Sequence, residues 1–167
     1  MEVRDPTPNR RTNKPNYGIE MKTIIALIDF SDLTKKVIET ASQIASSYAS
    51  TLWLLHVIDP DFAGFEVGPQ LGCGTKPAQA NTEKSALEGL AKKLEIGEGR
   101  IETLLVRGNV VDSVLDESKR LHADLLVTGS HGHGTIYTMV VGSVSNGLLR
   151  QSTVPLLIVP HRGHATT

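Results

Sequence analysis

The chain has 167 residues, 40% of them hydrophobic, so it can bury one substantial core and is too short for two ordinary domains. Its 17 basic and 18 acidic side chains give a net charge of -1, which provides no overall attraction to nucleic acid or an anionic membrane. No apolar run approaches the roughly 20 residues that span a bilayer. Cys73 is the only cysteine, which excludes an intramolecular disulfide. We expect one soluble, cytoplasmic domain.

The first 20 residues differ in composition from the rest. They contain three prolines, four basic residues and almost no aliphatic side chains, so they match neither a secretory signal nor a core-forming pattern. We expect a disordered extension over residues 1–20, a folded domain over 21–160 and a flexible tail over 161–167.

The first half of the domain alternates apolar runs with amphipathic stretches. Residues 23–28 and 51–57 are short apolar runs typical of strands covered on both faces. Between them, Ser31 can cap a helix whose apolar side chains recur at helical spacing: Leu33, Val37, Ile38, Ala41, Ile44, Ala45 and Tyr48. A strand, a helix and a strand in this order predict a right-handed crossover unit.

Residues 59–80 lose this periodicity and predict a long surface loop. A helix is expected to begin at Asn81 or Thr82 and to end near Gly97, with one apolar face made of Ala86, Leu87, Leu90, Ala91 and Leu94. A third strand is expected over residues 101–106.

The second half repeats the alternation. Asn109 is the expected N-cap of a helix that carries Val110, Val111, Val114, Leu115, Ser118 and Leu121 on one side. Strands are expected over residues 124–128 and 154–159, with a short helix over 143–151 between them. Pro155 near the start of the last strand places that strand at a sheet edge.

Five strands alternating with four helices predict a three-layer α/β/α sandwich around a five-stranded parallel sheet, in the Rossmann-like class. The strand order 3-2-1-4-5 places the first and fourth strands side by side. Ligands of such sheets bind outside the carboxyl ends of the strands, where the strand order reverses. Asp29 follows the first strand and Gly129 ends the fourth, so their loops are expected to face each other.

The segment from Gly129 to Ser145 has the composition of an anion site. Glycines let the backbone approach a phosphate, and Gly142 and Ser143 open a helix whose amides and dipole favour negative charge. Ser143 and Ser145 add hydroxyl groups beside it. Glycine also punctuates ordinary strand-to-helix loops, so spacing alone leaves a purely structural interpretation open.

The order of these residues resembles the universal stress protein family, in particular its ATP-binding branch, over about residues 21–160. That branch has Gly, two residues, Gly, nine residues, Gly and then Ser or Thr, which matches Gly129, Gly132, Gly142 and Ser143. The strings IIALIDFS and LLHVID resemble the ends of the family's first two strands. The resemblance implies the Rossmann-like fold known as adenine nucleotide alpha hydrolase-like.

The resemblance also implies a nucleotide site residue by residue. Leu27, Asp29 and Val57 fall where the family meets the adenine end. The ribose and phosphates would be held by the glycine-spaced segment, namely Gly129, Ser130, His131, Gly132, His133, Gly134, Gly142, Ser143, Val144 and Ser145. Many relatives have Arg or Lys where His133 stands. A protonated imidazole holds a triphosphate more firmly than a neutral one, so affinity is expected to rise as the pH falls from about 8 to about 6.

Metal and catalytic sites have weaker signals. The six histidines, at 56, 122, 131, 133, 161 and 164, are scattered, and no carboxylate accompanies them at a recognised spacing, so no metal site is assigned. The chain has no G-x-S-x-G elbow, Walker lysine or HEXXH string, so no catalytic residue is assigned and hydrolysis is expected to be slow at most. Asp29 could align water or Mg²⁺, contact adenine, or begin the following helix.

Two functions remain open from the sequence. In the first, the protein is a stress-response regulator that binds ATP, ADP or AMP, with or without Mg²⁺. In the second, it is a dimeric protein-interaction module with a vestigial nucleotide site. A homodimer through residues 154–159 is expected in either case, because an apolar edge strand is normally covered or paired and the family pairs this strand. Neither function involves nucleic acid or a membrane.

Overall fold

The structure, a computed structural model, describes residues 20–60, 76–130 and 142–161, and all that follows concerns those ranges. The predicted extension and tail lie almost wholly outside them, as do residues 61–75 of the predicted loop. The elements in chain order are β1 (Thr23–Leu27), α1 (Thr34–Tyr48), β2 (Thr51–Ile58), α2 (Lys76–Ala91), β3 (Arg100–Arg107), α3 (Val110–Arg120), β4 (Leu125–Gly129), α4 (Ser143–Gln151) and β5 (Leu156–Val159).

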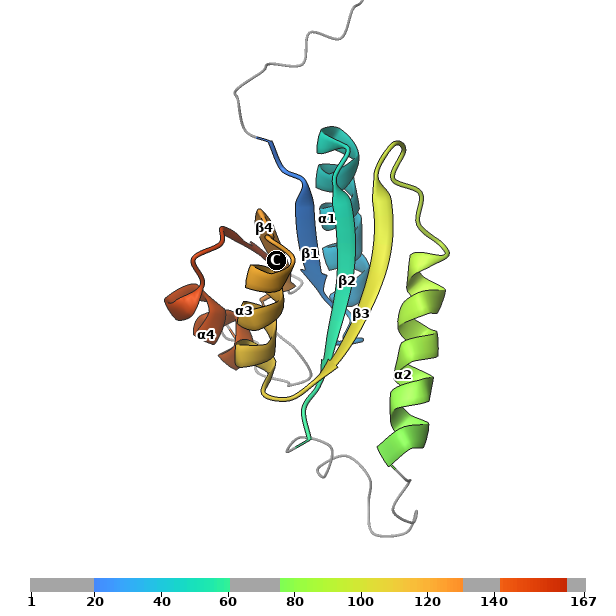
Figure 1. Ribbon diagram of the computed structural model, residues 1–167, viewed down its shortest axis with the longest axis vertical. Helices are drawn as coiled ribbons and strands as arrows, with labels where there is room; N and C mark the ends of the chain where they lie inside the picture. Colours follow the sequence, from blue (N-terminus) through green and yellow to red (C-terminus); the bar gives the residue numbers. More distant parts are fainter. Residues whose placement is uncertain (1–19, 61–75, 131–141, 162–167) are drawn as a thin grey trace, which may run out of the picture.

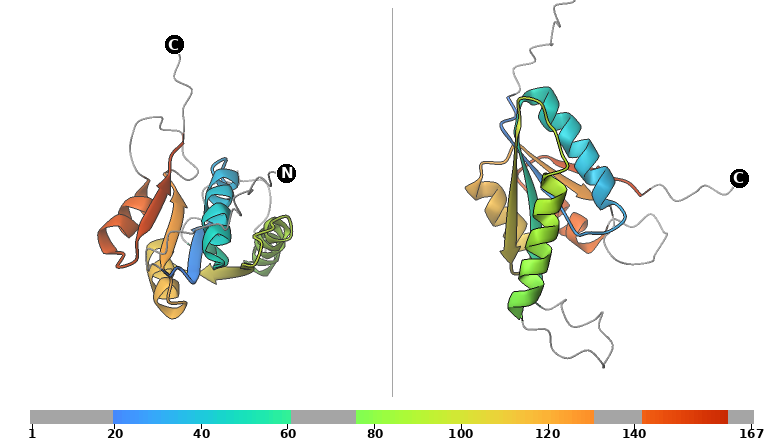
Figure 2. Two further views of the ribbon diagram at one scale, coloured as in Figure 1. Left: turned by 90° about the horizontal axis from the view of Figure 1, so that it is seen from above. Right: turned by 90° about the vertical axis from the view of Figure 1, so that its right-hand side faces the viewer.

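The strands form one parallel five-stranded sheet in the order β3-β2-β1-β4-β5, which confirms the predicted topology. β1 is central, with Ile25 paired to Trp53 of β2 on one side and to Leu126 of β4 on the other. Helices α1 and α2 cover one face, while α3 and α4 cover the opposite face (Figures 1 and 2). The molecule is therefore the three-layer sandwich expected from the alternation of elements.

The centre of β1 carries the core on both faces. Ile24, Ile25 and Ala26 are all 0% exposed. Ile24 and Ala26 pack with the α1 and α2 side chains, whereas Ile25 packs with those of α3 and α4. Alternate side chains of a strand point to opposite faces, so a strand buried on both sides is apolar throughout.

Two expectations for α1 are wrong. Tyr48 is 46% exposed rather than part of the buried stripe, because it is the last helical residue and Ala49 then turns the chain with a φ of 54°. The last buried side chain of the helix is Ala45, one turn earlier. Ser31 does not cap the helix directly, since Leu33 occupies the N-cap position without a side-chain capping bond.

Helix α2 starts earlier than predicted. It begins at Lys76, so residues 76–80 are helical and the predicted loop is wrong there. Pro77 lies in the first turn of the helix. Backbone N–H groups in a first turn make no hydrogen bond within the helix, so proline, which has no N–H, is tolerated there. The helix ends at Ala91 instead of near Gly97. Leu94 lies beyond it and still packs against the core.

The remaining elements agree with the sequence to within two residues. The side chain of Asn109 accepts a hydrogen bond from the Asp112 amide at 3.2 Å and caps α3 as predicted. Helix α4 has the predicted bounds. β5 begins at Leu156 rather than at residue 154, directly after Pro155, which has no N–H to donate. It pairs with β4 and forms one edge of the sheet that the structure describes.

Replacing either of two helical glycines with alanine is expected to change the stability, in opposite directions at the two positions. A Cβ on Gly147 of α4 would lie 2.8 Å from Cγ2 of Val111 on α3, whereas a Cβ on Gly89 of α2 would meet no described atom within 4 Å. We expect Gly147→Ala to lower the free energy of unfolding by about 1–2 kcal/mol through overpacking. Gly89→Ala is expected to raise it by about 0.5–1 kcal/mol through helix propensity. Urea unfolding of both variants measures the difference, and equal gains would contradict the close α3–α4 packing.

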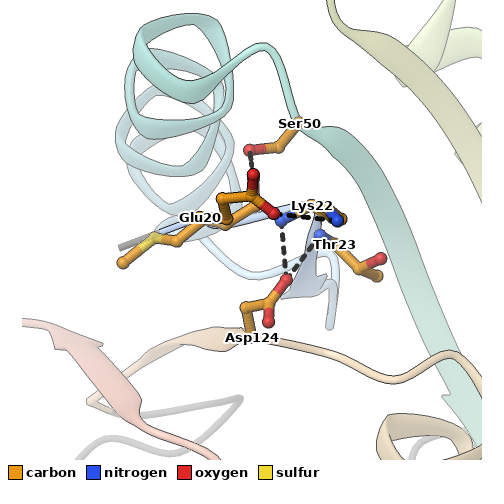
Figure 3. Close-up of polar contacts among 6 residues, drawn as sticks. Glu20, Lys22, Thr23, Ser50 and Asp124 are labelled. Carbon is orange, nitrogen blue, oxygen red and sulfur yellow. Dashed lines mark hydrogen bonds and ion pairs between the residues drawn. The ribbon is translucent and has the colours of Figure 1, made fainter. Parts of the chain in front are cut away.

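The amino-terminal edge of the sheet is held together by Asp124, just before β4 (Figure 3). Its Oδ2 accepts from the Lys22 amide at 2.6 Å and from the Thr23 amide at 2.9 Å. Its own amide donates to the Thr23 carbonyl at 2.8 Å. Beside it, the buried Ser50 hydroxyl donates to the Met21 carbonyl at 2.6 Å. These bonds fix the start of β1 between β2 and β4.

Candidate functional site

The strand order reverses between β1 and β4. From β1 the chain continues into α1 on one face of the sheet, while α4, which follows β4, lies on the opposite face (Figures 1 and 2). Ala26 of β1 pairs with Val127 of β4, and both strands end within two residues of that pair. The loops after them therefore start side by side at the carboxyl edge of the sheet, where ligands of such folds bind. Asp29, Gly129 and Ser130 all lie at this edge, as predicted.

The Asp29 carboxylate organises the turn from β1 into α1. Its Oδ1 accepts from the Ser31 amide at 3.0 Å, the Ser31 hydroxyl at 2.7 Å and the Thr34 hydroxyl at 3.2 Å. The Ser31 hydroxyl oxygen in turn accepts from the Leu33 amide at 3.3 Å. The sequence left several roles open for Asp29, and these contacts show one of them, which is to begin the following helix. Ser31 therefore supports the start of the helix through this network, although it is not the N-cap residue.

Phe30, directly after Asp29, has an unusual backbone. Its φ is 57°, in the left-handed region that bulky side chains rarely adopt. Such a conformation costs energy and persists only where the surroundings hold it, most often at functional sites. The Phe30 ring packs against the His56 ring of β2, with centroids 4.7 Å apart and planes tilted by 58°. The turn after β1 is therefore held from β2 as well as from α1.

The end of β4 and the start of α4 are fastened together. The Gly142 amide donates to the Ser130 carbonyl at 2.7 Å, so the chain returns at Gly142 to the point where it left the sheet. Ser130 is itself buried, and its amide donates to the Val159 carbonyl of β5 at 2.9 Å. Its hydroxyl oxygen accepts from the His161 amide at 3.1 Å. Ser130 and Gly142, on either side of segment 131–141, consequently share one anchor at the carboxyl ends of β4 and β5.

Helix α4 opens at this anchor with Gly142 as its N-cap residue. The amides of its first turn, at Ser143, Val144 and Ser145, have no partner within the helix, which makes the helix start attractive to anions. The Ser143 side chain is exposed, and that of Val144 is half-buried. Ser145 is buried, and its hydroxyl donates to the Gly129 carbonyl at 2.7 Å. That hydroxyl hydrogen ties α4 to β4, so it does not serve as a donor to an anion as the sequence suggested.

The other predicted residues divide into two groups. Leu27 ends β1 and Val57 lies near the end of β2; both are half-buried and pack with the α3 and α4 side chains. They lie on adjacent strands at the same edge as Asp29, since the Ile28 amide donates to the Leu55 carbonyl at 2.8 Å. His131, Gly132, His133 and Gly134 lie outside the described residues, so their part in the site stays a prediction.

Sequence reasoning missed a histidine and a carboxylate at this edge. His56 Nδ1 lies 2.6 Å from the Ile28 carbonyl oxygen, and its Nε2 lies 3.5 Å from Glu83 Oε2 of α2. The two side chains are only 12% and 23% exposed. The available signal was the position of His56 one residue before Val57, at the carboxyl end of a strand beside β1. The contact with Glu83 had no signal, because α2 was predicted to begin near that residue.

A separate groove lies between α1 and α2. It begins at the turn after β1 and is lined by Phe30, Ile38, Ala86, Leu90 and Leu94 together with polar and charged side chains from α1 and from just after α2. Within residues 20–60, 76–130 and 142–161, no three His, Cys, Asp or Glu side chains gather as metal ligands. In the same ranges, no helix combines the length and apolarity that crossing a membrane requires.

Known proteins share both sequence and fold with this chain. A model of the universal stress protein family matches residues 20–160. Universal stress protein A homolog 1 of Coxiella burnetii is 31% identical over 140 residues, covering 83% of this chain and 95% of that protein. The solved structure of MJ0577 from Methanocaldococcus jannaschii superimposes with a TM-score of 0.72 at 23% identity, over 87% of this chain and 99% of that one.

A universal stress protein solved in complex with cAMP gives a TM-score of 0.59 at 27% identity, over 85% of this chain and 98% of that one. The family match spans every described strand and helix, from three residues before β1 to one residue after β5. Sequence, topology and the carboxyl-edge geometry agree, and the chain belongs to the universal stress protein family.

Proposed function

We propose that this protein binds an adenine nucleotide, ATP in the first place, across the carboxyl edge of β1 and β4. The observation that carries the proposal is the bond from the Gly142 amide to the Ser130 carbonyl, which puts the start of α4 at the carboxyl end of β4, the strand next to β1. Gly129, Gly142 and Ser143 flank that bond at the spacing of the ATP-binding branch. The related universal stress protein solved with cAMP supports an adenine ligand.

The proposed roles follow the position of each residue. Leu27, Asp29 and Val57 face the adenine end, where half-buried apolar side chains cover the base and a polar group selects it. The first-turn amides of α4 take the phosphates. Ser145 contributes its amide and holds α4 in place through Gly129. Residues 131–134 are proposed to contact the ribose and phosphates, on the basis of their glycine spacing and of His133.

Occupancy by the nucleotide, rather than its turnover, is the proposed output. The site offers a carboxylate in Asp29, and its Oδ1 accepts three hydrogen bonds at the start of α1. Among the described residues we assign no general base toward water, and we propose hydrolysis that is slow at most. The protein then acts as a cytoplasmic regulator in the stress response, reporting ATP, ADP or AMP, with Mg²⁺ entering alongside the triphosphate.

Calorimetric titration of freshly purified protein tests the proposal. ATP, ADP, AMP and cAMP are titrated in parallel, with GTP as the control of equal charge. We expect saturable binding of about one adenine nucleotide per chain and much weaker binding of GTP, because the base contacts are specific. Denatured protein is also assayed for bound nucleotide, so that prior occupancy is not mistaken for failure. An empty protein that binds none of them would leave the interaction module as its function.

The edge of the sheet favours assembly as a second property. β5 pairs only with β4 among the described strands, and Leu149 on the neighbouring α4 is 61% exposed. An unpaired apolar edge is a template for a second copy. The proposed homodimer is formed through residues 154–159 and is compatible with either function.

Light scattering at tens of micromolar measures this assembly. We expect about twice the 18.0 kDa chain mass. Ile158→Lys places a charge on the half-buried edge strand and is expected to yield a monomer, since charged side chains block edge pairing. Thr153→Lys adds the same charge to an exposed position before β5 and leaves the mass unchanged. A monomeric wild-type protein would contradict the dimer.

A further inference from the structure

A cluster of four residues behind the turn after β1 has no role in the function proposed so far. The His56 cluster, as we call it, consists of Ile28, Phe30, His56 and Glu83. It joins β1, the following turn, β2 and α2. Three of its contacts converge on one imidazole that is only 12% exposed.

The contact with Ile28 assigns a hydrogen to one nitrogen of the imidazole. A carbonyl oxygen only accepts hydrogen bonds, so Nδ1, at 2.6 Å from it, carries a hydrogen and donates. Ile28 follows β1 directly and precedes Asp29. The histidine of β2 therefore holds the backbone at the point where the chain turns toward the proposed adenine contact.

The contact with Phe30 acts on the other side of Asp29. Phe30 keeps a left-handed φ of 57°, which a phenylalanine adopts at a cost. Its ring lies against the His56 ring at 4.7 Å, so packing opposes relaxation of the backbone. Asp29 thus lies between two residues that are both held by the same imidazole.

Glu83 brings a carboxylate to the other nitrogen of the imidazole. Its Oε2 lies 3.5 Å from Nε2, on the side of the ring opposite the Ile28 contact. A carboxylate on the second ring nitrogen is the usual means of fixing the orientation of a working histidine. Burying an aliphatic side chain at position 56 would have a smaller desolvation cost than burying a histidine. The presence of a histidine there therefore needs a functional explanation.

We propose that His56 is a positioning residue of the nucleotide site. It fixes the Ile28 carbonyl and the Phe30 ring so that the Asp29 turn is preformed for the adenine end, and Glu83 orients it from α2. The inference rests on the proposed function for its ligand. The preformed turn itself is a property of the free protein and is measured without any nucleotide.

Variants of His56 separate donation from packing. In His56→Asn the side-chain amide can take the place of Nδ1–H, whereas in His56→Gln it reaches the place of Nε2. His56→Leu fills the space without any donor. Glu83→Gln keeps the size of that side chain, and Glu88→Gln, on the exposed side of α2, is the matched control.

Two readouts are used for each variant. Hydrogen exchange of the Ser31 and Leu33 amides, which bond to Asp29 and Ser31, reports the order of the turn in free protein. Calorimetry reports the affinity for ATP. For His56→Leu we expect about tenfold faster exchange and about tenfold weaker binding, the scale of one lost hydrogen bond. His56→Asn restores both to within about threefold, His56→Gln does not, and Glu88→Gln changes neither.

The outcomes distinguish the two proposals. If hydrogen exchange responds as expected but neither the wild type nor any variant binds an adenine nucleotide, the proposed function is wrong and the preformed turn is still supported. If ATP binds normally and neither readout distinguishes Leu, Asn and Gln at position 56, the role of His56 is wrong. Should His56→Leu fail to fold, the comparison of Asn with Gln decides, and equal behaviour of those two overturns the inference. Nitrogen-15 spectra of the ring that show Nδ1 without a hydrogen overturn it as well.

Discussion

Gly142→Asp is expected to lower the affinity for ATP about 100-fold without loss of the fold. Gly142 has a φ of -57° and a ψ of 162°, which any residue adopts, and it occupies the N-cap of α4 without a side-chain capping bond. Aspartate is a favourable N-cap residue, so the free energy of unfolding is unchanged or slightly higher. Its carboxylate, however, takes the place proposed for phosphate at the helix start. Like charges forced together at a binding site cost several kcal/mol.

Gly142→Asn is the matched control for that prediction. It has nearly the same shape and also caps helices well, but it carries no charge. We expect a loss of about tenfold at most from crowding, and a stability equal to that of Gly142→Asp. Calorimetric titration gives the affinities and urea unfolding gives the stabilities. Equal affinities in the two variants would show that no anion binds at the start of α4.

Asp124→Ala is expected to destabilise the fold by about 2 kcal/mol. The change removes a charged acceptor from two backbone amides, those of Lys22 and Thr23, at the start of the central strand (Figure 3). Hydrogen bonds to a charged group contribute more than neutral ones, and the Thr23 amide is half-buried, so water replaces the carboxylate incompletely. Urea unfolding at neutral pH measures the loss.

Two further variants control for Asp124. Asp124→Asn keeps one oxygen acceptor, and we expect it to lower the free energy of unfolding roughly half as much as Asp124→Ala does. Glu20→Gln removes the nearby ion pair with Lys22, whose side chains are both 78% exposed. That pair lowers the pKa of Glu20 through its hydrogen bond to the Lys22 ammonium, yet such an exposed pair contributes little to folding. If Glu20→Gln lowered the free energy of unfolding as much as Asp124→Ala does, the role of Asp124 at the start of β1 would be contradicted.

The fold was predictable because its signals are local and repeated. The apolar run of β1 and the helical spacing of Val37, Ile38 and Ala41 each indicate one element, and alternation then permits few topologies. The errors lie where a local rule competes with context. Lys76–Ala91 extends through a proline because a first turn tolerates it, and Tyr48 ends a helix beyond its last buried turn.

The site was predictable only in outline. The glycine spacing and the carboxyl-edge rule place Asp29, Gly129 and Gly142 together, and the structure brings these three to one edge. The commitment of the Ser145 hydroxyl to the Gly129 carbonyl is a contact across 16 positions that no pattern indicates. The His56 cluster depends on contacts between β1, β2 and α2, which lie far apart in the sequence, so no local pattern indicates it.

Backbone amide shifts during an ATP titration test the central claim most directly. We predict that the largest changes fall at the carboxyl edge, on residues 27–31, 57, 129–130 and 142–145, with little change on the α2 side of the groove between α1 and α2. Leu90 and Leu94 line that groove and serve as its reporters. Changes centred on Leu90 and Leu94, with the start of α4 unaffected, would contradict a nucleotide site between β1 and β4.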